Sequence, residues 1–362
     1  MNTTIGSYPP GDVTFLLKEI SDQVREVNTE EREQLIQSGV HYSEMLPREY
    51  EPTAQYIALF KNLLESHASK IALITAVTAR RIKRYFRSRP VLVSLARAGT
   101  PAGVLLRRYI RSSYEEDWPH YSISIIRGKG IDTNALNYLV DAYGEDPLVF
   151  IDGWTGKGAI TRELQQACEE YNNQYSKKVK PVLAVLADPG YCANICATFE
   201  DLLIPNACLN ATVSGLVSRT FHRSDIIGPD DYHGVKFYSD KLSEDYSNLF
   251  VNRIEREFPA LRETEDADCD FFVSNPTFSG MKSVEEIQKR YSIDSIHRIK
   301  PGVGETTRVL LRRMPWKVLV NPQSSNNIDH ILQLAKERNV PVEQYTHMPY
   351  SCCGLIRKKR DK

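Results

Sequence analysis

The chain has 362 residues, of which 41% are hydrophobic and 25% charged, a composition typical of a globular protein with room for two domains. Its formal net charge is zero, which argues against a surface coated in nucleic acid. No stretch approaches the roughly 20 apolar residues that span a bilayer, and residues 1–15 show no secretory leader. Because the 7 cysteines are then expected to stay reduced, we predict a cytoplasmic protein without disulfides and without membrane contact.

The charge is distributed unevenly along the chain. Residues 271–362 hold 16 Lys and Arg against 8 Asp and Glu, a net charge of +8, whereas residues 1–270 hold 30 against 38, a net charge of −8. Residues 262–270, RETEDADCD, are acidic and almost free of apolar side chains, as in a solvated linker. We therefore predict a large domain over residues 1–260, a linker over 261–275 and a small basic domain over 276–362.

Four apolar runs in the first two thirds of the chain alternate with segments of helical periodicity. They occupy residues 90–96, 121–128, 147–153 and 181–190. Continuous runs of this kind are typical of parallel strands that are buried on both faces. We predict an α/β fold with a doubly wound sheet, in which the ligand lies beyond the carboxyl ends of the strands.

The third run leads into DGWTGKGAIT, residues 152–161, where a helix begins. Glycines let backbone N–H groups approach an anion, and the start of a helix adds partial positive charge. We predict a phosphate-binding loop, beside which Asp152 can bind ribose hydroxyls or Mg²⁺. The predicted phosphate contacts are Thr155, Gly156, Lys157, Gly158 and Thr161. A Walker A loop is excluded, because Gly158 stands where Ser or Thr would hold the metal.

Three segments in this order resemble the working loops of type I phosphoribosyltransferases. VFIDGWTGKGAIT resembles their PRPP-binding loop, VSLARAGTPAGVLLRRYI their pyrophosphate loop, and residues 127–132 the basic segment that closes over PRPP. The resemblance implies a phosphoribosyltransferase-like fold that binds PRPP with Mg²⁺. It also implies catalytic roles for Asp152, Arg97 and Lys129, the last two steadying the departing pyrophosphate. Further PRPP contacts would come from Ala98, Gly99, Thr100 and Arg127.

The fourth run is followed by Asp188 and Tyr191, where this fold places the acceptor base, although Asp-Pro-Gly also fits a simple turn. The resemblance thus predicts a PRPP-dependent phosphoribosyltransferase, a glycosyltransferase that makes a nucleotide or nucleoside-like compound from a base-like acceptor. Gly153 stands where the family usually has a second acid. That departure favours an alternative, a non-catalytic RNA-binding regulator that senses PRPP or a nucleotide.

The tail contains GVGETTRVLLRR, residues 302–313, inside a pattern of alternating helices and strands. This segment resembles the RNA-contacting loop of the pelota-type domain, which implies a small αβα unit. Arg308 and Arg312 are four residues apart and share a helix face, although such a face is also compatible with simple solvation. The predicted RNA-binding residues are Gly304, Glu305, Thr306, Arg308, Arg312 and Arg313.

The whole chain resembles the bacterial StiP family, through GSYPPGDVTFLLK, HYSEMLP and DDYHGVKFYSD. The resemblance implies a role in tellurium resistance and stress response, a homodimer by analogy, and a cysteine protease as the second alternative. A cysteine protease needs a thiol close to an imidazole. The pairings left open are Cys192, Cys196 or Cys208 with His222 or His233, and Cys352 or Cys353 with His347.

Overall fold

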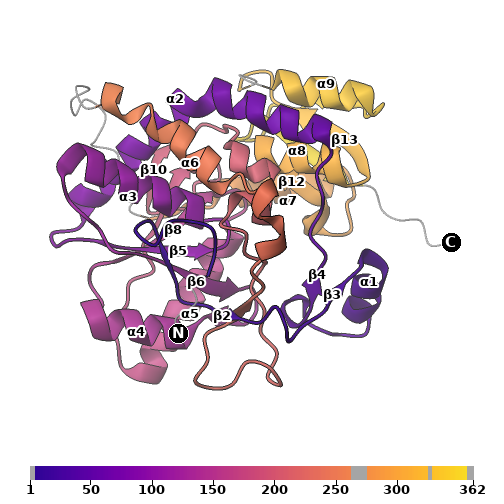
Figure 1. The fold of residues 1–362 in the computed structure, drawn as a ribbon. Coiled ribbons are helices and arrows are strands. Elements are labelled where there is room, and N and C mark those ends of the chain that lie inside the picture. The colour runs from indigo at the N-terminus through magenta and orange to yellow at the C-terminus, as the bar shows by residue number, and fades with distance from the viewer. Residues whose placement is uncertain (1–4, 262–274, 325–327, 357–362) are drawn as a thin grey trace.

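The structure is a computed structural model that describes residues 5–261, 275–324 and 328–356 (Figure 1). We call residues 5–261 the N-terminal part and residues 275–356 the C-terminal part. Most of the predicted linker and the basic end at 357–362 lie outside the described residues. Within the described residues, no helix is long and apolar enough to cross a membrane.

The N-terminal part is built on a sheet with the strand order β1-β6-β5-β8-β9-β10, in which β7 pairs with β6. All pairings in this sheet are parallel except that of β6 with β7. The predicted parallel α/β sheet is therefore confirmed. The strands are β1 (Thr14–Phe15), β5 (Val91–Ala96), β6 (His120–Ile126), β7 (Gly130–Ile131), β8 (Leu148–Trp154), β9 (Leu183–Ala187) and β10 (Ile195–Thr198).

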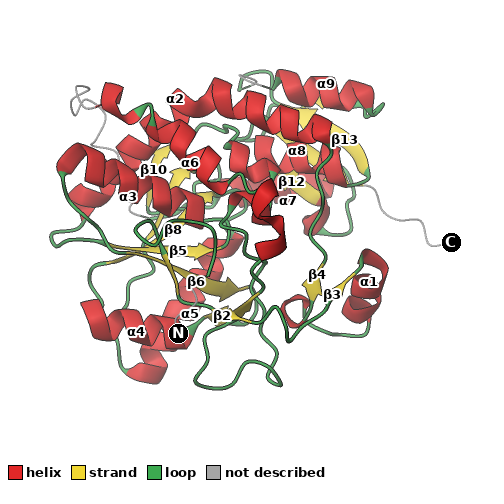
Figure 2. Ribbon diagram, in the orientation of Figure 1, coloured by secondary structure: helices red, strands yellow, loops and turns green. Residues whose placement is uncertain are grey.

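Helices pack on both faces of this sheet (Figures 1 and 2). Along β8, Val149 and Ile151 join the apolar cluster formed with α2 and α3, whereas Phe150 joins the cluster formed with α4 and α5. Alternate side chains of one strand are thus buried on opposite faces, which explains the unbroken apolar runs. The helices are α2 (Ala54–Tyr85), α3 (Thr100–Tyr114), α4 (Thr133–Tyr143) and α5 (Ala159–Tyr175).

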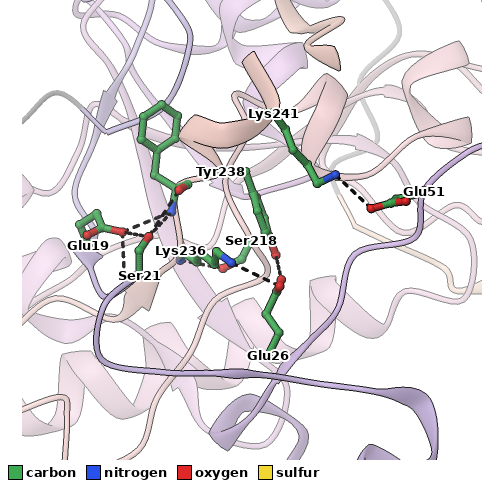
Figure 3. Close-up of polar contacts among 9 residues, drawn as sticks. Glu19, Ser21, Glu26, Glu51, Ser218, Lys236, Tyr238 and Lys241 are labelled. Atoms are coloured by element: carbon green, nitrogen blue, oxygen red, sulfur yellow. Dashed lines mark hydrogen bonds and ion pairs between the residues drawn. The ribbon is translucent and has the colours of Figure 1, made fainter. Parts of the chain in front are cut away.

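Short elements surround the sheet and support its carboxyl edge. Figure 3 shows how Glu26 accepts the hydroxyl of Tyr238 over 2.8 Å and pairs with Lys236, whose own backbone N–H donates to Ser218 over 2.9 Å. These bonds join the first 50 residues to the segment 217–240. The elements are β2 (Lys18–Glu19) paired with β11 (Gly234–Val235), β3 (Glu26–Val27) paired with β4 (Leu46–Pro47), α1 (Thr29–Gln37) and α6 (Ser247–Glu255).

The C-terminal part has its own sheet, with the order β12-β15-β13-β14. Strand β15 lies antiparallel between β12 and β13, and its residues Cys352 and Cys353 are fully buried. Figure 1 shows this part beside the start of α2. Its elements are α7 (Ser279–Arg290), β12 (Ile299–Pro301), α8 (Val303–Arg312), β13 (Pro315–Val320), α9 (Asp329–Glu337), β14 (Val342–Gln344) and β15 (Cys352–Ile356).

Candidate functional site

A cavity of about 310 Å³ opens at the carboxyl ends of β5 and β8. These strands are neighbours whose chain connections leave in opposite directions, which is the position where open α/β sheets bind ligands. The C-terminal part completes the wall with the first turns of α8. The lining comes from residues 97–98, 152–160, 202–214 and 301–308.

The predicted phosphate-binding loop lines the cavity, but two of its side chains are already engaged elsewhere. The hydroxyl of Thr155 donates to Asp188, and Nζ of Lys157 donates to the carbonyls of Ile296 and Ile299 over 3.1 Å each. Thr161 is fully buried in the first turn of α5, and its hydroxyl has no hydrogen-bond partner among the described atoms. Lys157 therefore holds the two parts together rather than pointing at a free anion site.

Glycines are needed in this loop because other groups fill the space beside them. A methyl group on Gly156 would overlap the ring of Trp154, and one on Gly158 would lie 2.8 Å from Sγ of Cys192. Gly158 also has a φ of 70° at the start of α5, a conformation that favours glycine. The glycines of this loop are therefore explained by close packing and by the positive φ of Gly158, without a bound ligand.

Asp152 lines the cavity, and its titration is shifted. Burial raises the pKa of this carboxyl to about 6, although the N–H of Gly153 and the charge of Arg308 oppose the shift. Mg²⁺ usually keeps several waters and binds one or two protein carboxylates together with phosphate oxygens of a substrate, and Asp152 could supply one such carboxylate. The described residues contain no group of acidic, His and Cys side chains that could hold a metal. The predicted Mg²⁺ contact of Asp152 stays a prediction.

Arg97 and Ala98 also line the cavity. The guanidinium of Arg97 is held by Glu49 at 2.6 Å and by the carbonyl of Val217 at 3.0 Å, with both charged side chains largely buried. Burial raises the pKa of Glu49, but the charge and hydrogen bond of Arg97, together with the charge of Arg219 and a hydrogen bond from Asn210, leave the pKa below its usual value. Arg97 is thus paired inside the protein.

The other predicted pyrophosphate contacts do not line the cavity. Thr100 shares a buried hydrogen bond of 2.8 Å with Ser122, and Gly99 packs against the carbonyl of Ile151. Lys129 binds Glu44 over 2.7 Å, and Arg127 lies over the ring of Tyr42.

The turn after β9 is built around a buried carboxylate. Asp188 accepts the backbone N–H groups of Cys192 and Ala193 over 2.8 Å, and burial raises its pKa. The ring of Tyr191 stacks on Phe199 with centroids 4.3 Å apart. Both predicted acceptor-binding side chains therefore make contacts within the protein, and their role in binding stays a prediction.

The six described cysteines are all free and buried. Cys192 contacts the wall of the cavity, with Sγ 3.5 Å from the carbonyl oxygen of cavity-lining Gly156 and 3.2 Å from that of Gly190. Burial, with a smaller effect of Asp188, raises the pKa of its thiol to about 12. Cys208 follows cavity-lining Ala207, and burial raises its pKa to about 11.

The candidate imidazoles make their contacts with other groups. His233 hydrogen bonds with Ser124 over 2.8 Å and packs against His222, with ring centroids 4.7 Å apart. His347 packs edge-on against Tyr345. In the described residues these contacts give no thiol–imidazole pair of the kind that the sequence left open.

The predicted RNA-binding residues of α8 face the N-terminal part. Arg308 donates to the carbonyl of Ala207 over 2.6 Å, and Arg312 donates to the hydroxyl of Tyr56 over 2.9 Å while lying over the ring of Tyr50. Thr306 is fully buried, Gly304 and Glu305 line the cavity, and Arg313 is exposed. The sequence analysis missed Tyr50 and Tyr56, whose rings bind the guanidinium of Arg312 by cation–π contacts.

Comparison with known proteins overturns the predicted activity. Residues 6–255 match the family model described as "Tellurite-like stress resistance cysteine protease StiP". A protein of Acinetobacter baylyi (strain ATCC 33305 / BD413 / ADP1), named "Cysteine protease StiP", is 34% identical over 365 residues that cover 98% of this chain and 94% of that protein. The predictions of a PRPP-dependent phosphoribosyltransferase, of a glycosyltransferase class and of nucleotide biosynthesis were therefore wrong. In the structure, Thr155, Lys157 and Arg97 bind other groups of the protein, whereas the prediction had them bind PRPP.

The C-terminal part has a separate match. Residues 278–358 match the model described as "PELOTA RNA binding domain", which confirms the predicted family of that domain. The StiP model spans more than half of the chain, and the Acinetobacter relative covers nearly all of it. The chain therefore belongs to the StiP family and carries a pelota-type domain at its C-terminal end.

Proposed function

We propose that this chain is a thiol-dependent peptidase, with Cys192 as its nucleophile and the cavity at the carboxyl edge of the sheet as its substrate site. The observation that carries the assignment is the position of the thiol. Its Sγ touches the carbonyl of cavity-lining Gly156 and lies beside Gly158, the first residue of the turn that opens α5. The name of the Acinetobacter relative supports the reaction class.

The chemistry requires a thiolate, which attacks a peptide carbonyl, releases the amine and leaves an acyl-enzyme that water hydrolyses. In the structure, burial is the main cause that raises the pKa of Cys192, so the thiol is protonated at neutral pH. Exposure of the thiol to water would remove that cause, while Gly158 at the start of α5 stays beside Sγ, where the helix dipole favours the anion. Asp188 contacts the backbone N–H of Cys192, and its charge raises the pKa of the thiol as long as the carboxylate is ionised.

The test is hydrolysis of labelled casein by the full chain. Cys192→Ser should abolish hydrolysis, whereas Cys168→Ser should retain it, because Cys168 is buried on α5 against the sheet. Full activity in Cys192→Ser would overturn the assignment of the nucleophile. A lack of hydrolysis both by the wild type and by a variant with a displaced C-terminal part would overturn the peptidase itself.

We also propose that the C-terminal part binds RNA in a stress-resistance role. The match over residues 278–358 and the net charge of +8 over residues 271–362 support this. A gel-shift titration with an RNA hairpin should show affinity that falls steeply with salt. Salt-independent or absent binding would count against it.

The type I phosphoribosyltransferase-like architecture is proposed for the N-terminal part as a fold alone. It is supported by the parallel order β6-β5-β8-β9 with helices on both faces. A crystal structure that aligns this sheet with those enzymes strand for strand is the test.

A further inference from the structure

The face of α8 that resembles an RNA-binding surface is the face that docks on the N-terminal part. Arg308 and Arg312 reach the carbonyl of Ala207 and the hydroxyl of Tyr56, so both guanidinium groups are occupied. Gly304 also packs there, because a methyl group on it would lie 3.4 Å from the side chain of Ala207. While the two parts remain docked, RNA must compete with these partners, although the side chain of Arg308 stays 38% exposed.

A carboxylate holds the N-terminus of α8. Oδ1 of Asp201 accepts the N–H of Val303 over 3.0 Å, and Oδ2 accepts the N–H of Ser351 over 2.8 Å. Asp201 comes from the N-terminal part and is 5% exposed. Backbone N–H groups at a Gly-opened helix start are also the groups that favour a phosphate. Asp201 therefore occupies the place that an RNA phosphate would take.

The same docking shelters Cys192. The N–H of Gly280 donates to the carbonyl of Gly190 over 3.1 Å, and the hydroxyl of Tyr350 donates to the carbonyl of Gly156 over 3.1 Å. These two carbonyls are the ones that Sγ of Cys192 contacts. Both walls around the thiol are thus tied to the C-terminal part.

We propose that RNA and the N-terminal part compete for the same face of α8, so that RNA capture undocks the C-terminal part and uncovers Cys192. The competition itself rests on the proposed RNA binding, and its consequence for catalysis rests on the proposed peptidase. The chain would then be a peptidase that is restrained by its own RNA-binding domain.

The energetics set how strong the competition is. One apolar cluster includes Leu203 of the N-terminal part together with Val303 and Leu310 of α8, so docking buries apolar surface as well as polar bonds. The apparent RNA affinity is the intrinsic affinity multiplied by the fraction of undocked chains, and the coupling is reciprocal. A change that weakens docking and leaves the RNA-binding groups intact must therefore tighten RNA binding.

Gly280→Ala is the variant that disturbs the docked interface. Gly280 is the second residue of α7, and alanine is a better helix former than glycine. At the interface, the added methyl would lie 2.7 Å from Cα of Gly190 and 2.9 Å from the carbonyl oxygen of Gly156, both in the N-terminal part. It would also overlap the hydroxyl of Tyr350 within the C-terminal part, so retention of Cys168 protection and of the unfolding midpoint is the check on folding. Ser283→Ala on the same helix is the matched control, because Ser283 bonds only within α7, to the carbonyl of Ser279.

The experiment uses the full chain with Cys269→Ser, since Cys269 lies outside the described residues. An RNA hairpin with an internal bulge is titrated while iodoacetamide labelling of each cysteine is followed by mass spectrometry. We expect RNA to accelerate labelling of Cys192 about tenfold or more and Gly280→Ala to tighten RNA binding to a similar degree, while Ser283→Ala does neither. Cys168 should stay protected, which distinguishes undocking from unfolding.

Three results would overturn the inference: RNA that binds without exposing Cys192, a Gly280→Ala chain that exposes Cys192 without binding RNA more tightly, or no RNA binding by either form. If RNA exposes Cys192 but no form hydrolyses peptides, the competition stands and the proposed peptidase alone fails. The same hairpin sequence as duplex DNA serves as the control for charge, and we expect less labelling with it.

Discussion

Oδ1 of Asp201, in the N-terminal part, accepts the backbone N–H of Val303, at the start of α8, over 3.0 Å. This bond places a buried carboxylate at the positive end of a helix that belongs to the other part of the chain. Two residues about 100 positions apart in sequence thus fix the docking that closes the cavity.

Asp201→Ala should loosen the docking. The change leaves the N–H groups of Val303 and Ser351 without their acceptor, which costs about 1–3 kcal/mol for each buried group left unpaired. Urea denaturation at neutral pH should report the loss, and Cys192 should become more reactive. Asp230→Ala, at an exposed position, should change neither quantity. A wild-type denaturation curve for Asp201→Ala would contradict the role given to this carboxylate.

The docking should weaken as pH rises through the weakly acidic range. Burial raises the pKa of Asp201 from 3.8 to about 6 in the docked state. A raised pKa means that this group contributes its full stabilisation below pH 3.8 and that the contribution is lost as pH rises through 6. The stability difference between wild type and Asp201→Ala should therefore be larger at pH 4.5 than at pH 7. A difference that grows with pH would contradict this.

Arg312 and Arg313 are neighbours with different roles in the structure. Arg312→Ala should expose Cys192, because it removes the bond to Tyr56 and the packing on Tyr50. Arg313→Ala should leave Cys192 protected, since Arg313 is exposed, yet it should weaken RNA binding by removing a positive charge. Alkylation rates and gel-shift titrations on both variants check the pair. Equal effects on alkylation would contradict the docked orientation of α8.

Glu49→Gln should destabilise the N-terminal part. It leaves the largely buried guanidinium of Arg97 without its countercharge, which costs about 3 kcal/mol when a buried pair is broken on one side. Glu51→Gln is the matched control, because the Glu51 side chain is 76% exposed in its pair with Lys241, shown in Figure 3. Thermal unfolding should separate the two variants by several degrees. Identical midpoints would show that Arg97 does not depend on Glu49.

The parallel sheet could be predicted because its signals are local. Each buried strand is a continuous apolar run, and the position of the cavity follows from the order of the strands. Strand β15 was missed, since Cys352 and Cys353 were considered as candidate nucleophiles rather than as the middle of a second sheet. Nothing in the sequence around Asp201 indicates a bond to Val303, because such contacts depend on how two distant segments dock.

The activity was predicted wrongly because one local pattern served two purposes. A Gly-rich turn before a helix can admit a phosphate, but here Gly158 makes room for Sγ of Cys192. Lys157 fits a phosphate-binding loop in sequence, yet it binds two carbonyls of the C-terminal part. The predicted RNA-binding residues Arg308 and Arg312 likewise bind Ala207 and Tyr56, and these contacts depend on the docking of distant segments.

The most direct test of the account compares peptide hydrolysis by three full-length chains: wild type, Gly280→Ala and Gly280→Ala with Cys192→Ser. Undocking should uncover the thiol, so Gly280→Ala should hydrolyse labelled casein faster than wild type does. The double variant should be inactive, because it keeps the open cavity and lacks the nucleophile. Hydrolysis by the double variant at the rate of Gly280→Ala would contradict the central claim that the C-terminal part shelters a catalytic Cys192.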